Sequence, residues 1–150
     1  MKIQGVDEHC FKMWKLLWNI SHKEFEKVYK RLDVTIQECR ESFYNSKIVT
    51  VNQEFYDSGL VRVEGGGAKC VFIPKFQSPL MLQKNGSGFG YNSMDMTALK
   101  YHLFTLGAAC IIVITNYSQA DNFAMCNTAT ANIEWLKIPK FQRYYSVEGI

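Results

Sequence analysis

Apolar side chains recur every three or four positions near the start of the chain, which predicts amphipathic helices. Phe11, Trp14 and Trp18 follow this spacing and predict a first helix over residues 8–20. Ser21 is followed by a glutamate three residues later, which is the spacing of a capping box, so a second helix is expected to begin there. The lysines of this second helix lie mostly opposite its apolar stripe, which favours a solvated surface over an RNA-binding groove.

The next apolar pattern predicts a third helix, from about Ile48 to Ser58, that ends at Gly59. Beyond Gly59 the pattern changes to short runs rich in β-branched residues. The run LVRVEGGGAKCVFI holds two of them on either side of residues 65–67, which predicts a β-hairpin. PLMLQK predicts a further short strand.

A helical stripe returns after residue 95 and is expected to end at Gly107. The stripe consists of Met96, Leu99, Leu103 and Leu106. The continuous apolar run ACIIVIT, residues 109–115, then predicts a strand buried on both faces, as in a parallel sheet covered by helices. NYSQADNFAM predicts another helix and WLKIP a last strand, and this succession indicates the α/β fold class.

Composition narrows the class of protein. The chain has 150 residues, 47% of them hydrophobic and 21% charged, which suits one globular domain with a substantial core. The net charge of +3 is too small to argue for a nucleic-acid partner. Five singly spaced cysteines indicate a reducing compartment rather than a disulfide framework or a zinc site. With no apolar leader and no membrane-spanning run, we expect a soluble cytoplasmic protein, although an organellar location stays open.

Several short patterns match known sites only in part. The glycine-rich loop NGSGFG fails the dinucleotide fingerprint because Tyr91 stands where a glycine is needed, and no lysine–hydroxyl pair forms a P-loop. The three histidines are far apart, and none lies at a metal-ligand spacing, so no metal site is predicted. KMWK resembles an ATP-loop signature but lies inside the first predicted helix, where coincidence is the better interpretation.

Tyr91, Asp95 and Gln119 form the most informative constellation. Ser93 is predicted to cap the helix that follows, so Asp95 would lie in its first turn, where the helix dipole stabilises a carboxylate. That alone could explain Asp95. Alternatively, a phenol, a carboxylate and an amide at two neighbouring helix starts could form a pocket for a planar cation, and a guanidinium is the natural candidate.

The motif in this region resembles the arginyl-tRNA synthetases, whose pattern is a Tyr, a Ser/Thr-rich turn, Asp-Leu/Met-Ala-Ala-Leu and then Tyr-Arg. The corresponding residues are Tyr91, Ser93, Asp95, Met96, Ala98, Leu99 and Tyr101. Downstream, QADNF resembles the family's Gln-x-x-His-Phe, and upstream RESFYN resembles its Gly-Glu-Ser-Phe-Tyr. The similarity runs from about Phe11 to Gln142 and is greatest to plant-like members.

The resemblance implies a partial Rossmann-like parallel sheet with flanking helices and a β-hairpin insertion. It implies that Tyr91, Asp95 and Gln119 contact the side chain of bound arginine. The family reaction activates arginine with ATP and Mg²⁺ and then transfers it to its tRNA, with positioning and electrostatic stabilisation carrying most of the catalysis.

Other parts of the family pattern do not occur in this sequence. The His-x-Gly-His ATP motif, the downstream phosphate-clamping loop and the anticodon-binding domain are missing, so residues 1–150 resemble part of a catalytic domain. Positions also depart from the pattern, among them His102 for an arginine, Asn122 for a histidine and Asn127 for an apolar residue. We therefore expect a ligase fragment that is inactive alone, or else a non-catalytic truncated paralogue or interaction module.

Such a fragment should also expose apolar surface that an intact catalytic domain would cover. We expect this surface at Trp14, at Trp18 and along residues 110–114, with self-association as its consequence.

Overall fold

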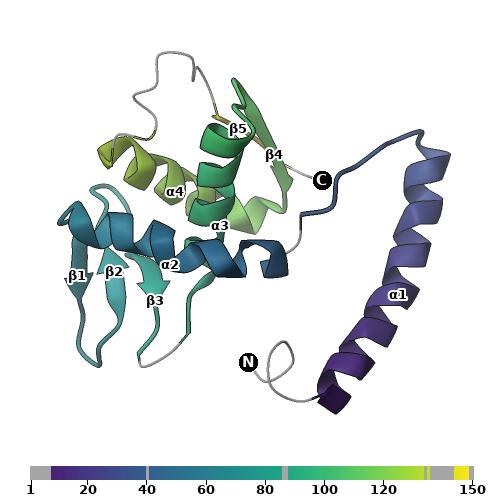
Figure 1. Ribbon diagram of the computed structural model, residues 1–150. Helices are drawn as coiled ribbons and strands as arrows, with labels where there is room; N and C mark the ends of the chain where they lie inside the picture. Colours follow the sequence, from purple (N-terminus) through teal and green to yellow (C-terminus); the bar gives the residue numbers. More distant parts are fainter. Residues whose placement is uncertain (1–7, 40, 86–87, 134, 136–143, 149–150) are drawn as a thin grey trace. The chain divides into compact units, whose positions relative to one another are not determined.

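The computed structural model describes residues 8–39, 41–85, 88–133, 135 and 144–148 (Figure 1). The chain divides into two compact units, residues 1–39 and residues 40–150. None of the described helices is both long enough and apolar enough to cross a membrane.

The first unit is built on one continuous helix, α1 (Glu8–Arg31), where the sequence predicted two (Figure 1). The predicted break at Ser21 is wrong because a capping serine must leave the helical conformation, and no glycine or proline favours that here. The apolar stripe that includes Trp18 and Phe25 also continues in register across Ser21. After α1, the chain reaches Glu38, whose carboxylate lies 3.6 Å from His22 Nδ1.

The second unit begins with helix α2 (Glu41–Asp57), which starts seven residues before the predicted position. Its buried stripe explains the difference, because the stripe starts at Tyr44 and continues at helical spacing through Ile48 and Val51. Gly59 follows with a φ of +72°, a conformation that glycine adopts without strain, so the predicted end of this helix is confirmed.

An antiparallel sheet follows α2, with strand order β1-β2-β3. The strands are β1 (Val61–Val63), β2 (Lys69–Val71) and β3 (Leu80–Gln83). The hairpin predicted around residues 65–67 is the β1–β2 connection, in which Gly66 and Gly67 have positive φ, and the strand predicted in PLMLQK is β3.

The remaining elements alternate between helix and strand. Helix α3 (Tyr91–Lys100) continues into a π-helical turn, η1 (Tyr101–Thr105), and then into strand β4 (Ile111–Thr115). A 3₁₀ turn, η2 (Tyr117–Gln119), leads into α4 (Ala120–Asn132), and β5 (Tyr144–Glu148) pairs with β4 in parallel. The α/β class and a parallel pair are therefore present, whereas the strand predicted in WLKIP lies mostly outside the described residues.

The core of the second unit lies where α2, α3, α4 and β3 meet, with α3 packed against both α2 and α4 (Figure 1). Its largest fully buried side chains include Phe55, Leu80, Leu82 and Met96. Burying side chains of this kind contributes about 1.5–3 kcal/mol each, so this cluster holds α3 and α4 in place.

Strand β4 differs from its prediction because only one of its faces is covered. Ile111 is buried in the core, but Ile112 and Ile114 are 62% and 78% exposed. Among the described residues, side chains of the core cover one face of β4, and none covers the other face. Exposed apolar surface is thus present on this strand, as expected. On α1, by contrast, the most exposed apolar side chains are Leu17, Ile20 and Phe25, whereas Trp14 and Trp18 are half-buried.

Candidate functional site

The start of α3 is fastened to strand β3 by its backbone. The Gly90 N–H donates to Leu82 O at 3.1 Å, and a Cβ on Gly90 would lie only 2.8 Å from Met81 O. Gly90 is the N-cap residue of α3, and Ser93 lies inside the helix with its hydroxyl donating to Leu82 O. The predicted capping role of Ser93 is therefore wrong, because its hydroxyl bonds to the neighbouring strand instead of to the helix N–H groups.

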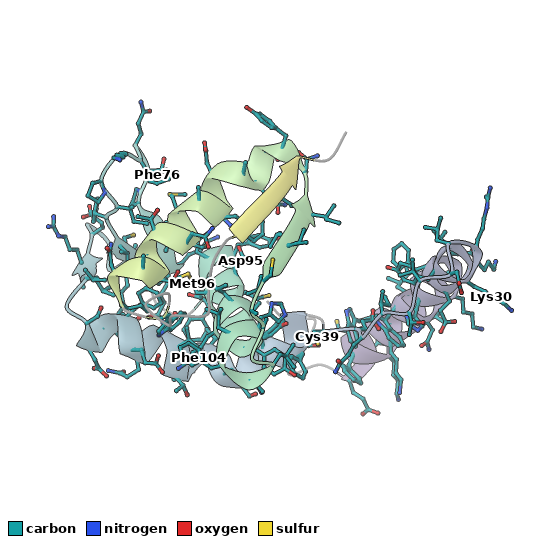
Figure 2. The ribbon with its side chains drawn as sticks, turned by 90° about the horizontal axis from the view of Figure 1, so that it is seen from above. Lys30, Cys39, Phe76, Asp95, Met96 and Phe104 are labelled. Atoms are coloured by element: carbon teal, nitrogen blue, oxygen red, sulfur yellow. The ribbon has the colours of Figure 1, made fainter. Side chains whose placement is uncertain are left out.

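Asp95 lies in the second turn of α3, since the helix begins four residues earlier at Tyr91. The first turn of α3 contains no acidic residue, so helix-dipole stabilisation does not explain Asp95. The Asp95 side chain is half-buried on the side of α3 that faces α4 (Figure 2). There, Asn122 Nδ2 donates to Asp95 Oδ2 at 2.7 Å and joins the two helices.

Gln119 lies at the beginning of α4, as its N-cap residue. The preceding turn is stabilised by Asn116, whose Oδ1 accepts a hydrogen bond from the Ser118 N–H at 3.0 Å. Thr115, the last residue of β4, donates from its hydroxyl to Gln119 Oε1 at 2.8 Å. A carbonyl oxygen has two lone pairs, so Oε1 can accept a second hydrogen bond from a ligand.

Of the three residues predicted to contact arginine, Asp95 and Gln119 lie near each other, and Tyr91 lies farther out. Asp95 bonds to Asn122, which lies one helical turn beyond Gln119, so two of the three residues surround the first turn of α4. Tyr91 precedes Asp95 by four residues and shares its face of α3, but the Tyr91 side chain is 78% exposed. The phenol therefore lies at the outer edge of this region, where its ring and hydroxyl face solvent.

Cys126 supplies a second group beside Asp95. Burial raises the pKa of the Cys126 thiol well above its usual range, and the negative charge of Asp95 raises it further. Cys126 lies one turn after Asn122 on α4 and is almost completely buried. The thiol is consequently neutral, and it neither competes with a cation for Asp95 nor acts as a nucleophile.

A separate pocket of about 240 Å³ lies between α2 and the α3–η1 segment. Its lining residues are Ser46, Lys47, Thr50, Val51, Thr97, Lys100, Tyr101, Phe104 and Thr105. Lys100, at the wall of this pocket, forms an ion pair with Glu54, which also accepts a hydrogen bond from Trp135 Nε1 at 3.2 Å. None of Tyr91, Asp95 and Gln119 lines this pocket, so it is distinct from the predicted arginine contacts.

The part of the chain that the structure describes does not assemble a recognisable metal site. Within it, no group of three or more His, Cys, Asp or Glu side chains could hold a metal ion. Gly90, the last residue of the glycine-rich loop, is explained by its close approach to β3.

Comparison with known proteins connects this geometry to a family. Residues 1–143 match the family model "tRNA synthetases class I (R), catalytic domain". The chain is 41% identical over 136 residues to the chloroplastic/mitochondrial arginine–tRNA ligase of Arabidopsis thaliana. It belongs to the arginyl-tRNA synthetase family.

The similarity extends to a solved structure and to the cytoplasmic branch of the family. The cytoplasmic arginine–tRNA ligase of Arabidopsis thaliana is 40% identical over 136 residues. The crystal structure of arginyl-tRNA synthetase from Plasmodium falciparum superposes with a TM-score of 0.86 at 34% identity, covering 98% of this chain and 26% of that one. Each of the two plant matches includes 91% of this chain. The chain spans only about a fifth of the length of these relatives, 21% and 23%.

Two of the positions predicted to depart from the family pattern have unusual surroundings in the structure. The Oδ1 atom of Asn127 is buried without a hydrogen-bond partner in the described part of the chain. Burial lowers the pKa of the His102 imidazole, which favours its neutral form.

Sequence reasoning missed the role of Asn122, which it treated only as a departure from the histidine of Gln-x-x-His. The spacing held a usable signal, because residues three positions apart at the start of a helix, such as 119 and 122, lie on the same side of it. What the sequence did not indicate was that this face meets α3 at Asp95.

Proposed function

We propose that this chain contains the arginine-recognition part of an arginine–tRNA ligase, with Asp95 as the guanidinium partner. The observation that carries the proposal is the position of Asp95, half-buried between α3 and α4 and bonded by Asn122. The helix dipole does not explain this carboxylate, because Asp95 lies beyond the first turn of α3. A guanidinium ligand suits it chemically, because a guanidinium presents parallel donors that match two carboxylate oxygens.

The other two contact residues suit the remainder of an arginine side chain. Gln119 Oε1 can accept a further hydrogen bond beside its contact with Thr115. Tyr91 offers a ring face to a cation and a hydroxyl to a donor, and its exposure leaves it accessible to a ligand that arrives from solvent. Each neutral contact is typically worth about 0.5–1.5 kcal/mol, whereas a charge-assisted one is worth about 1.5–3 kcal/mol. Asp95 is therefore expected to dominate recognition.

Activation of arginine with ATP and Mg²⁺, and its transfer to tRNA, belong in this proposal to the longer enzyme. The 150 residues contain no His-x-Gly-His motif. We expect this chain alone to bind arginine weakly and to catalyse no arginine-dependent exchange between ATP and pyrophosphate. The plant relatives include a cytoplasmic and a chloroplastic/mitochondrial protein. We propose a cytoplasmic location on the basis of the five singly spaced cysteines, to be tested with a fluorescent fusion.

A non-catalytic interaction module is the second candidate function. Its support is the uncovered side of β4, where Ile112 and Ile114 present apolar side chains to solvent. Surfaces of this kind mark protein contacts in soluble proteins when they are contiguous.

Isothermal titration separates the two candidates. The chain is titrated with arginine, with citrulline and with ATP, since citrulline keeps the size of the side chain but has no charge. Binding of arginine in preference to citrulline supports the ligase fragment. Equal absence of heat for arginine and citrulline would leave the interaction module as the better account.

A further inference from the structure

We infer that Asn122 is a positioning residue that holds the Asp95 carboxylate in a fixed orientation between α3 and α4. The inference rests on the proposed arginine site, to which it adds a residue that does not itself touch the ligand. Its geometric basis is the 2.7 Å hydrogen bond from Asn122 Nδ2 to Asp95 Oδ2.

Orientation matters because a guanidinium forms its strongest pairing with both oxygens of a carboxylate in one plane. A carboxylate on a helix surface rotates freely about its terminal side-chain bond, whose torsion has broad minima. The bond from Asn122 restricts this rotation by binding one named oxygen. It uses only one of the roughly four acceptor positions of the carboxylate, so it orients the group without exhausting its capacity.

The chemistry of Asn122 also preserves the charge on which recognition depends. A lysine or arginine at this position would itself pair with Asp95 and would compete with the guanidinium of the ligand. The amide donates a hydrogen bond and brings no charge. The Cys126 thiol beside Asp95 is neutral as well, because burial and the charge of Asp95 both raise its pKa.

The frame around this pair is rigid enough for such a role. Asn122 lies in the first turn of α4, and the same helix buries Cys126 and Ala129 in the core. On the other side, Asp95 lies between Ser93 and Met96, both of which are completely buried and hold α3 in place. The two ends of the hydrogen bond are thus fixed by packing that neither Asn122 nor Asp95 provides.

The first experiment compares ligand affinities of Asn122→Ala with those of the matched control Asn132→Ala, an exposed asparagine on the same helix. Asn122→Ala is expected to weaken arginine at least fivefold while changing citrulline less than twofold, and the control should change neither. A purely structural loss would weaken both ligands alike. Equal losses for arginine and citrulline, or none for arginine, would overturn the inference.

The second experiment needs no ligand, so it separates a failure of this inference from a failure of the proposed function. Urea unfolding of Asn122→Ala, Asp95→Ala and the double variant forms a double-mutant cycle. The unfolding equilibrium constant of the double variant should differ at least threefold from the value that the two single effects would give independently. Independent effects would overturn the pairing, whereas coupling without arginine binding would retain the pairing and reject only the arginine site.

A third measurement uses the unmodified chain, in case the variants do not fold. The side-chain NH₂ resonances of Asn122 should shift as acid protonates the Asp95 carboxylate, because its acceptor oxygen changes, while those of Asn132 should stay in place. Resonances of Asn122 that do not respond to acid would contradict the hydrogen bond.

Discussion

Asn52 offers a direct test of how polar burial limits the stability of the second unit. Its side chain on α2 is only 1% exposed, and both Nδ2 and Oδ1 lack a hydrogen-bond partner within the described residues. A buried amide left unpaired costs about 1–3 kcal/mol. The residue lies directly after buried Val51 on the face of α2 that enters the core, so a leucine there would be surrounded by apolar neighbours.

Asn52→Leu should therefore increase the free energy of unfolding by about 1–3 kcal/mol, since leucine has the same number of side-chain heavy atoms and removes both unpaired groups. For a chain of this length, each kcal/mol corresponds to about 2–4 °C, so the midpoint of thermal unfolding should rise by roughly 2–12 °C. Urea unfolding followed by circular dichroism measures the change. Asn45→Leu is the matched control on the exposed side of the same helix, and its effect should stay within about 0.5 kcal/mol. An Asn52→Leu variant no more stable than this control would refute the reasoning.

Two further predictions concern the Cys126 thiol and the uncovered face of β4. Burial raises the pKa of Cys126, so the folded state keeps the thiol proton, while the unfolded chain loses it above about pH 9. The free energy of unfolding should therefore fall by up to about 1.4 kcal/mol per pH unit from pH 9 upward. Urea midpoints between pH 8 and pH 10.5 should show a shallower decline for Cys126→Ala than for the unmodified chain, and equal slopes would contradict the raised pKa. Replacing Ile112 and Ile114 with lysine should reduce concentration-dependent self-association in sedimentation velocity, whereas Val49→Lys, which changes an exposed apolar residue of α2, should not. A monomeric unmodified chain at high concentration would reject the role of this strand.

Periodicity predicted the local structure of this chain well where one apolar stripe decides the outcome. The end of α2 at Gly59, the hairpin at residues 65–67 and the helix after Gly90 all depend on short-range patterns that are complete in the sequence. The break at Ser21 failed because a capping box acts only when the backbone leaves the helix, and the sequence alone does not show whether it does. The double-sided burial of β4 failed because an apolar run predicts what could be buried, not what covers it.

The sequence was enough to propose candidate residues for a site but not to predict how they are arranged. Asp95 was expected in the first turn of a helix capped by Ser93, but it lies in the second turn of α3, which already begins at Tyr91. Gln119 lies at the start of the next helix, as expected. The Asp95–Asn122 hydrogen bond, however, spans 27 positions and depends on how α3 packs against α4. No local pattern encodes that contact, and the same is true of the bond from Ser93 to β3 that displaced its expected capping role.

The most direct test of the central claim is the affinity of Asp95→Asn for arginine and for citrulline, measured by titration calorimetry beside the unmodified chain. Asparagine keeps an oxygen that can accept from Asn122, so this substitution removes the charge with little change in shape. Loss of a charge-assisted contact worth about 1.5–3 kcal/mol should weaken arginine by about 10- to 150-fold and leave citrulline within about threefold. An equal loss for both ligands, or a larger loss of arginine from Gln119→Ala than from Asp95→Asn, would contradict the assignment of Asp95 to the guanidinium.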